Sequence, residues 1–113
     1  MTTYTDDELH NIRFEISRAC EAINRRIDRY MDRQPLQELY EQIDVQRSRL
    51  SAIVRELTRD TLYFDPYVKA YNSIDEAALA ISLASSASDD DRPNFVDSTK
   101  DHLYRTVEFL VMS

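Results

Sequence analysis

Glycine is absent from this chain of 113 residues. Phosphate-cradling loops, dinucleotide-binding turns and nucleophile elbows need glycine where the backbone takes positive φ or approaches a ligand closely. The chain also has no Asn-Gly or Asp-Gly pair, which two-residue hairpin turns favour. The sequence therefore excludes these motifs and predicts little β-structure.

Cysteine and long apolar runs are scarce. Cys20 is the only cysteine, which excludes an intramolecular disulfide and a cysteine-rich zinc site, and its place beside an apolar helical stripe predicts a buried structural side chain. The longest apolar run, residues 77–84, is far shorter than the roughly 20 residues that span a bilayer. The first ten residues lack the pattern of a secretory signal. We expect a soluble, cytoplasmic protein without a membrane partner.

Positive charge is scarce in the second half of the chain. The formal net charge is −7, and residues 61–113 carry 9 acids against 4 bases, whereas residues 1–60 carry 12 against 10. A negative field repels phosphate backbones and anionic membranes. We expect no direct nucleic-acid binding, and a protein partner with a basic or apolar surface.

The apolar residues that are present recur with helical spacing. Thr5 and Glu8 form a capping box for a first helix that should run to about Arg33, with Tyr30 on its apolar stripe. Pro35 fits the first turn of a second helix. That helix carries an unbroken heptad seam typical of a coiled coil: Leu36, Leu39, Ile43, Gln46, Leu50, Ile53 and Leu57.

The short link around residues 32–35 predicts that these helices fold back as a long antiparallel hairpin over about 5–60. Antiparallel pairing would join basic residues of the first helix to acidic residues of the second. The expected pairs bring Arg25, Arg26, Arg29 and Arg33 beside Glu38, Glu41 and Asp44. This pairing explains the arginines without nucleic acid.

Two shorter helices are expected at about 66–87 and 94–112, and together with the hairpin they make one all-α domain, a small helical bundle. The first of them begins either at Ser73, where Glu76 completes a capping box, or as early as Asp65 with Pro66 in its first turn. Ser98 with Asp101 offers a cap for the last helix. The intervening stretch SSASDDDRPNF, residues 85–95, predicts a hinge, because adjacent aspartates and Arg92-Pro93 disfavour a continuous helix.

Helix length predicts exposed apolar surface. Two shorter helices would not cover a hairpin about 40 Å long at 1.5 Å per residue. The uncovered seam, together with the second apolar face of the helix at 66–87 or the apolar end at residues 108–113, would then be an interface, and we expect a homodimer or a constitutive partner.

Two groups of residues are candidates for partner binding. The aromatic residues Tyr63, Phe64, Tyr67 and Tyr71 would form one helical stripe, which either closes the end of the core or contacts a partner. The acids Asp89, Asp90 and Asp91 would either dock on a basic partner or form a solvated loop.

Catalytic constellations are missing. Glu38, Glu41 and Asp44 are spaced by three, which resembles half of the magnesium-binding ExxE and ExxD pattern of all-α nucleotide pyrophosphohydrolases. The positions that could supply the second half read ELTR and DSTK. His10 and His102 are not at metal-ligand spacing. We predict no catalytic residue, metal or cofactor, and no enzyme. The alternative that the resemblance implies is a metal-dependent nucleotide hydrolase.

The sequence thus favours a small acidic helical protein that binds a protein partner, of the inhibitor, antitoxin, immunity, anti-defence or adaptor type. One alternative is a nucleic-acid mimic that inhibits a DNA- or RNA-binding enzyme. Another is a structural subunit of a homo-oligomeric assembly.

Overall fold

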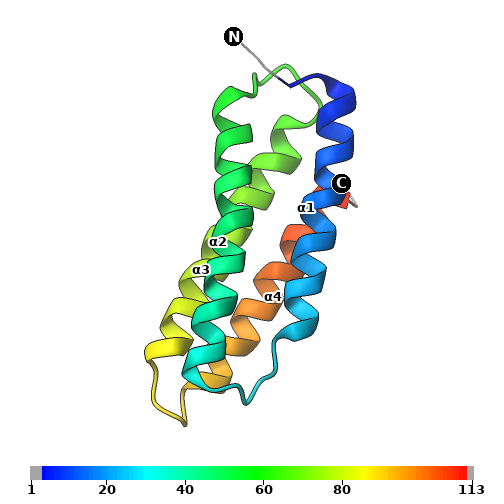
Figure 1. The fold of residues 1–113 in the computed structure, drawn as a ribbon. Coiled ribbons are helices and arrows are strands. Elements are labelled where there is room, and N and C mark those ends of the chain that lie inside the picture. The colour runs from blue at the N-terminus through cyan, green and yellow to red at the C-terminus, as the bar shows by residue number, and fades with distance from the viewer. Residues whose placement is uncertain (1–3, 112–113) are drawn as a thin grey trace.

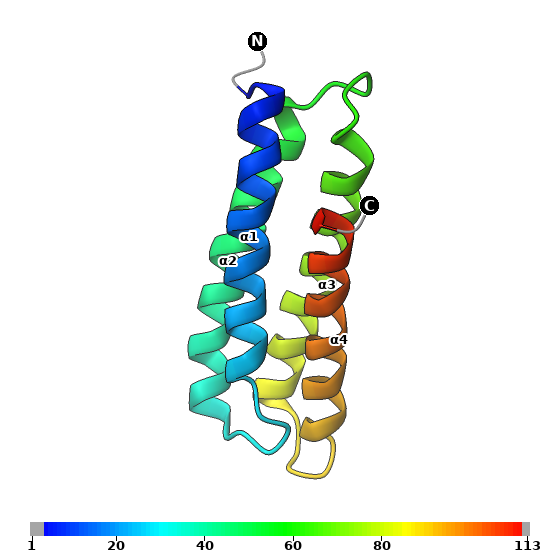
Figure 2. The ribbon, with the colours of Figure 1, turned by 90° about the vertical axis from the view of Figure 1, so that its right-hand side faces the viewer.

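The computed structural model describes residues 4–111, which fold into a bundle of four helices with alternating directions (Figure 1). The helices are α1 (Asp6–Arg26), α2 (Arg33–Glu56), α3 (Phe64–Ser86) and α4 (Arg92–Val111). Around the bundle, α1 lies beside α2 and α4, and α3 lies beside α2 and α4 (Figure 2). The prediction of a small all-α bundle is confirmed. Met112, where the last predicted helix ends, lies outside the described residues.

Within residues 4–111, none of the helices combines the length and the apolar character that crossing a membrane requires.

The start of α1 follows its local signal. The Thr5 hydroxyl accepts a hydrogen bond from the Glu8 amide at 3.1 Å, and the Glu8 carboxylate accepts one from the Thr5 amide at 3.3 Å. This confirms the predicted capping box. The end of α1 differs from the prediction, because the helix stops at Arg26 and Ile27 takes an extended conformation with φ −82° and ψ 121°.

The other predicted caps are wrong, because both pairs lie inside continuous helices. Ser73 is a buried residue in the middle of α3, which begins at Phe64, so the alternative start at Asp65 with Pro66 in the first turn is nearly correct. Ser98 likewise lies within α4. When the turn that precedes a candidate cap packs against neighbouring helices, that turn stays helical. The candidate cap then lies inside the helix, because tertiary contacts outweigh the local sequence preference.

The four helices are nearly equal in length, at 21, 24, 23 and 20 residues. The prediction that the last two helices are much shorter than the first two is therefore wrong. Residues 27–32 and 57–63 form loops instead of extending the first two helices. Tyr30 consequently lies in a loop and is 76% exposed rather than part of an apolar stripe.

The core takes side chains from all four helices. The heptad seam of α2 is confirmed, since its apolar members inside the helix are buried and Gln46 is half-buried. On α3 the core face is built from small side chains, which let the α3 and α4 backbones approach closely. The buried alanines of α3 are Ala70, Ala77, Ala78, Ala80 and Ala84.

Helix pairs differ in how closely they pack. Contact is most extensive between α3 and α4 and least extensive between α1 and α2, although α1 and α2 are consecutive in the chain. The predicted antiparallel hairpin therefore has the correct direction but the loosest seam in the bundle.

Polar contacts hold α1 to α4. Lys100 Nζ donates to the carbonyls of Asn24 and Ile27, both at 3.0 Å, where the end of α1 leaves carbonyls without helical partners. Arg13 donates in turn to the carbonyl of Leu110 near the end of α4. A cation at a helix C-terminus also interacts favourably with the helix dipole.

The four arginines that the sequence analysis assigned to the end of the first helix have different partners from those predicted. Arg29 forms an ion pair with Asp97 of α4 at 3.0 Å, and Arg33 donates to the carbonyl of Ala87. Arg25 lies 3.8 Å from Glu21 on its own helix. Arg26 does reach α2, where it donates to Gln42 at 2.8 Å. The predicted pairs of these arginines with Glu38, Glu41 and Asp44 are therefore wrong. Asp44 pairs with Arg47 within α2, and among residues 4–111 Glu38 and Glu41 form no ion pair.

Candidate functional site

The aromatic stripe predicted for partner binding divides between core and surface. Tyr67 is completely buried, and its hydroxyl donates to the Leu9 carbonyl of α1. Burial is the main cause that raises the pKa of Tyr67 above its ordinary value of 10. Tyr67 therefore belongs to the core, and its assignment as a partner contact is wrong for this fold.

Tyr63, Phe64 and Tyr71 are half-buried around that core position. The Tyr63 ring lies 6.4 Å from the Tyr67 ring, and the Arg13 guanidinium lies 5.7 Å from the Tyr63 ring. In Figure 2, α4 ends below the first turns of α1 and α3. The structure favours the alternative in which the stripe closes the core.

The three aspartates lie in the turn before α4. Asp91 accepts from the Ser88 hydroxyl at 3.1 Å, and its amide donates back to that hydroxyl at 3.3 Å. Asp89 forms an ion pair with Arg92 at 2.7 Å, while its own side chain remains 89% exposed. The chain therefore turns between the end of α3 at Ser86 and the start of α4 at Arg92, within the predicted hinge. The three aspartates in this turn are exposed to solvent.

Arg92 was not identified from the sequence as a structural residue. Its residue surface is 8% exposed, and it donates to the Ala87 carbonyl as well as to Asp89. Arg33 of α2 donates to the same Ala87 carbonyl at 3.2 Å. Two arginines therefore donate hydrogen bonds to the Ala87 carbonyl at the end of α3. These bonds stabilise the turn that contains Asp89–Asp91.

Leu79 and Leu83 are exposed large apolar residues one turn apart on α3. Leu79 is 61% exposed and Leu83 is 42% exposed. Asp75 and Glu76 precede them on the same helix and are also exposed. We refer to Asp75, Glu76, Leu79, Leu83 and Asp89–Asp91 as the α3 surface. The sequence pointed to it, because the helix at 66–87 has apolar residues on its second face.

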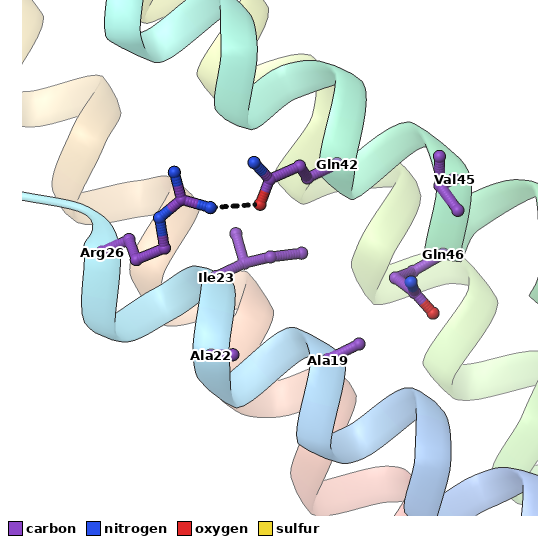
Figure 3. Close-up of a pocket in the computed structure, with 7 residues that line it drawn as sticks. All are labelled: Ala19, Ala22, Ile23, Arg26, Gln42, Val45 and Gln46. Atoms are coloured by element: carbon purple, nitrogen blue, oxygen red, sulfur yellow. Dashed lines mark hydrogen bonds between the residues drawn. The ribbon is translucent and has the colours of Figure 1, made fainter.

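A groove of about 300 Å³ lies between α1 and α2. Figure 3 shows Ala19, Ala22 and Ile23 of α1 facing Gln42, Val45 and Gln46 of α2, with the Arg26–Gln42 hydrogen bond across one end. Val45 is 57% exposed. The groove is the surface consequence of the loose α1–α2 seam.

In the part of the chain that the structure describes, the cysteine and histidine side chains that could act as a nucleophile, base or metal ligand are not arranged as a catalytic or metal site. Burial, followed by the charge of Glu21, raises the pKa of Cys20 to about 12, so its thiol is neutral at physiological pH. His102 Nδ1 lies 3.2 Å from a Glu76 carboxylate oxygen without hydrogen-bond geometry. Among residues 4–111, no group of three or more His, Cys, Asp and Glu side chains is arranged to hold a metal ion.

No protein-family model, no curated protein and no solved structure matches this chain. The interpretation of its surfaces therefore rests on their own chemistry.

Proposed function

We propose that this protein is not an enzyme and acts by binding a protein partner through the α3 surface. The observation that supports this proposal is the pair of exposed leucines, Leu79 and Leu83, with acidic residues before and after them. Apolar anchors that lose their contact with water supply most of the affinity in protein interfaces. A surrounding set of charges selects the partner and speeds association.

The charge of this surface defines the partner. Residues 70–91 contain five acids and no base. A complementary partner segment would combine apolar side chains with lysine or arginine, and an amphipathic basic helix meets both conditions. The exposed leucines would enter its apolar face, and Asp89–Asp91 would lie beside its cations.

Partner capture tests the proposal. Immobilised wild-type protein is expected to retain a stoichiometric protein from lysate of its native source, and the double variant Leu79→Ser/Leu83→Ser is expected to lose it. Leu62→Ser is the matched control, because Leu62 is 92% exposed but lies in the loop before α3. Retention of the same protein by the double variant would contradict the proposal.

A second measurement separates ordinary protein binding from nucleic-acid mimicry. The triple variant Asp89→Asn/Asp90→Asn/Asp91→Asn is expected to bind the captured partner at least tenfold more weakly at low salt, with a smaller difference at high salt, since salt screens exposed charges. Release of the partner by excess duplex DNA or RNA would favour the mimic instead.

A further inference from the structure

We propose that the outer face of α1 and α2 is the interface of a homodimer, in which the α2 helices of two copies cross in antiparallel orientation at Val45. This inference does not depend on the proposed function, because it concerns the opposite face of the bundle from α3 and α4.

The first support is the exposed apolar centre of this face. Val45 stands at the middle of α2 (Arg33–Glu56) and is 57% exposed. Beside it lies the groove whose α1 wall is formed by Ala19 and Ala22. A second Val45 would find small side chains and a recess next to it, which is the arrangement that close packing between helices needs.

The second support is charge complementarity along α2. Glu38 and Glu41 precede Val45, whereas Arg49 and Arg55 follow it. Two α2 helices that cross in antiparallel orientation at Val45 place the acidic half of each against the basic half of the other. Within residues 4–111, Glu38 and Glu41 have no ion-pair partner in the monomer, so they are available to a second copy.

The third support is size. At 1.5 Å per residue, α1 and α2 are about 31 and 36 Å long, and with a bundle width of 23 Å their face covers about 700 Å². A stable interface buries roughly 800 Å² on each partner. The range for specific interfaces is about 600–1,000 Å² on each partner, and the face falls in the lower part of that range when nearly all of its area is used.

The α3 surface does not suit a second copy. Its segment, residues 70–91, has five acids and no base, so two copies meeting there would repel one another. By contrast, α1 and α2 carry nearly equal numbers of acidic and basic residues. A dimer through α1 and α2 leaves both α3 surfaces exposed.

Light scattering coupled to size-exclusion chromatography tests the interface. The wild-type chain is expected to elute with twice the monomer mass at micromolar loading, and Val45→Lys with the monomer mass. Leu79→Ser is the matched control on the α3 surface and is expected to remain a dimer. A monomeric wild-type chain, or a Val45→Lys variant that remains a dimer, overturns the proposal.

Disulfide trapping tests the crossing point without relying on a disruptive charge. Val45→Cys is expected to form a covalent dimer under mild oxidation, visible on a non-reducing gel. The wild-type chain is the matched control, since its single thiol, Cys20, is buried. Leu83→Cys is expected to stay monomeric on the same gel. Equal cross-linking of Leu83→Cys and Val45→Cys overturns the assignment.

The partner-binding proposal is tested independently of the homodimer. Loss of partner capture in Leu79→Ser/Leu83→Ser changes neither the light-scattering mass nor the cross-linking result, so each proposal can be contradicted while the other stands.

Discussion

The two sides of α1 are packed differently. On the side that faces α4, Lys100 of α4 donates to carbonyls at the C-terminal end of α1. Arg13 of α1 donates to a carbonyl near the C-terminal end of α4. Toward α2, its neighbour in the chain, a groove remains, bridged by the Arg26–Gln42 hydrogen bond. Chain adjacency fixed the antiparallel direction of α1 and α2, whereas hydrogen bonds from two cations to helix-terminal carbonyls join α1 to α4.

This difference has a consequence for function. A seam with few contacts leaves apolar side chains exposed, and a partner could cover them. The same reasoning applies to α3, whose inner alanines pack against the bundle while its outer leucines remain exposed. Both proposed interfaces therefore lie where the fold leaves apolar residues uncovered.

The largest expected effect comes from the packed side. Leu103→Ala on α4 would leave a cavity in the core, where Leu103 is fully buried, and should lower the free energy of unfolding by about 2–5 kcal/mol. Leu79→Ala, at an exposed position, should change it by about 0.5 kcal/mol or less. Urea unfolding of both variants measures the difference, and equal losses would contradict the assigned burial.

The polar contacts of α1 can be compared directly. Lys100→Met keeps much of the aliphatic stem but removes the donor to Asn24 and Ile27, and should cost about 1–3 kcal/mol of unfolding free energy. Arg26→Met at the α1–α2 seam should cost about 0.5 kcal/mol or less, because its contact with Gln42 is exposed. A larger loss for Arg26→Met would reverse the ranking of the two seams.

The pH dependence of stability at alkaline pH tests whether the Cys20 thiol on α1 is buried. The thiol of Cys20 has a pKa of about 12 in the folded protein against an ordinary value of 9.0, so the unfolded chain loses its proton first. The stability contributed by the neutral thiol is complete below pH 9 and falls by about 1.4 kcal/mol per pH unit between pH 9 and 12. Tyr67, whose pKa is also raised, adds to this fall above pH 10. Urea unfolding at several pH values should show a smaller pH dependence for Cys20→Ala than for wild type, and an unchanged slope would contradict a buried thiol.

Filling the open seam should have a modest effect, in the opposite direction. Gln46→Leu replaces a half-buried polar residue beside the groove with an apolar one, and should raise the unfolding free energy by about 0.5–2 kcal/mol. Thermal unfolding at fixed protein concentration measures it. A clear decrease would indicate that Gln46 and its bond from Arg49 are needed for the register of α2.

Much of the fold could be predicted from local patterns. The heptad seam of α2, the Thr5–Glu8 capping box and the hinge before α4 all depend on residues close together in sequence, and the structure confirms them. The end of α1 and the caps assigned to Ser73 and Ser98 could not be predicted, because tertiary packing decides whether a turn of helix continues.

The candidate sites show the same division. The sequence placed Tyr67 and its aromatic neighbours on one stripe, but the burial of Tyr67 depends on packing against α1, where the Leu9 carbonyl accepts its hydroxyl. The aspartates were recognisable as exposed charges. The groove beside Val45 had no sequence signal, because it results from the spacing between two helices and not from either one.

By itself, the sequence determined that the chain is all-helical, that each helix has an apolar stripe, and that its acids concentrate in the second half, because these properties follow from residue type and spacing of three and four. The tertiary structure alone decided which helix pairs close and which apolar residues stay exposed. Those outcomes depend on contacts between residues distant in sequence: Lys100 with the end of α1, Arg13 with the end of α4, and Tyr67 with Leu9.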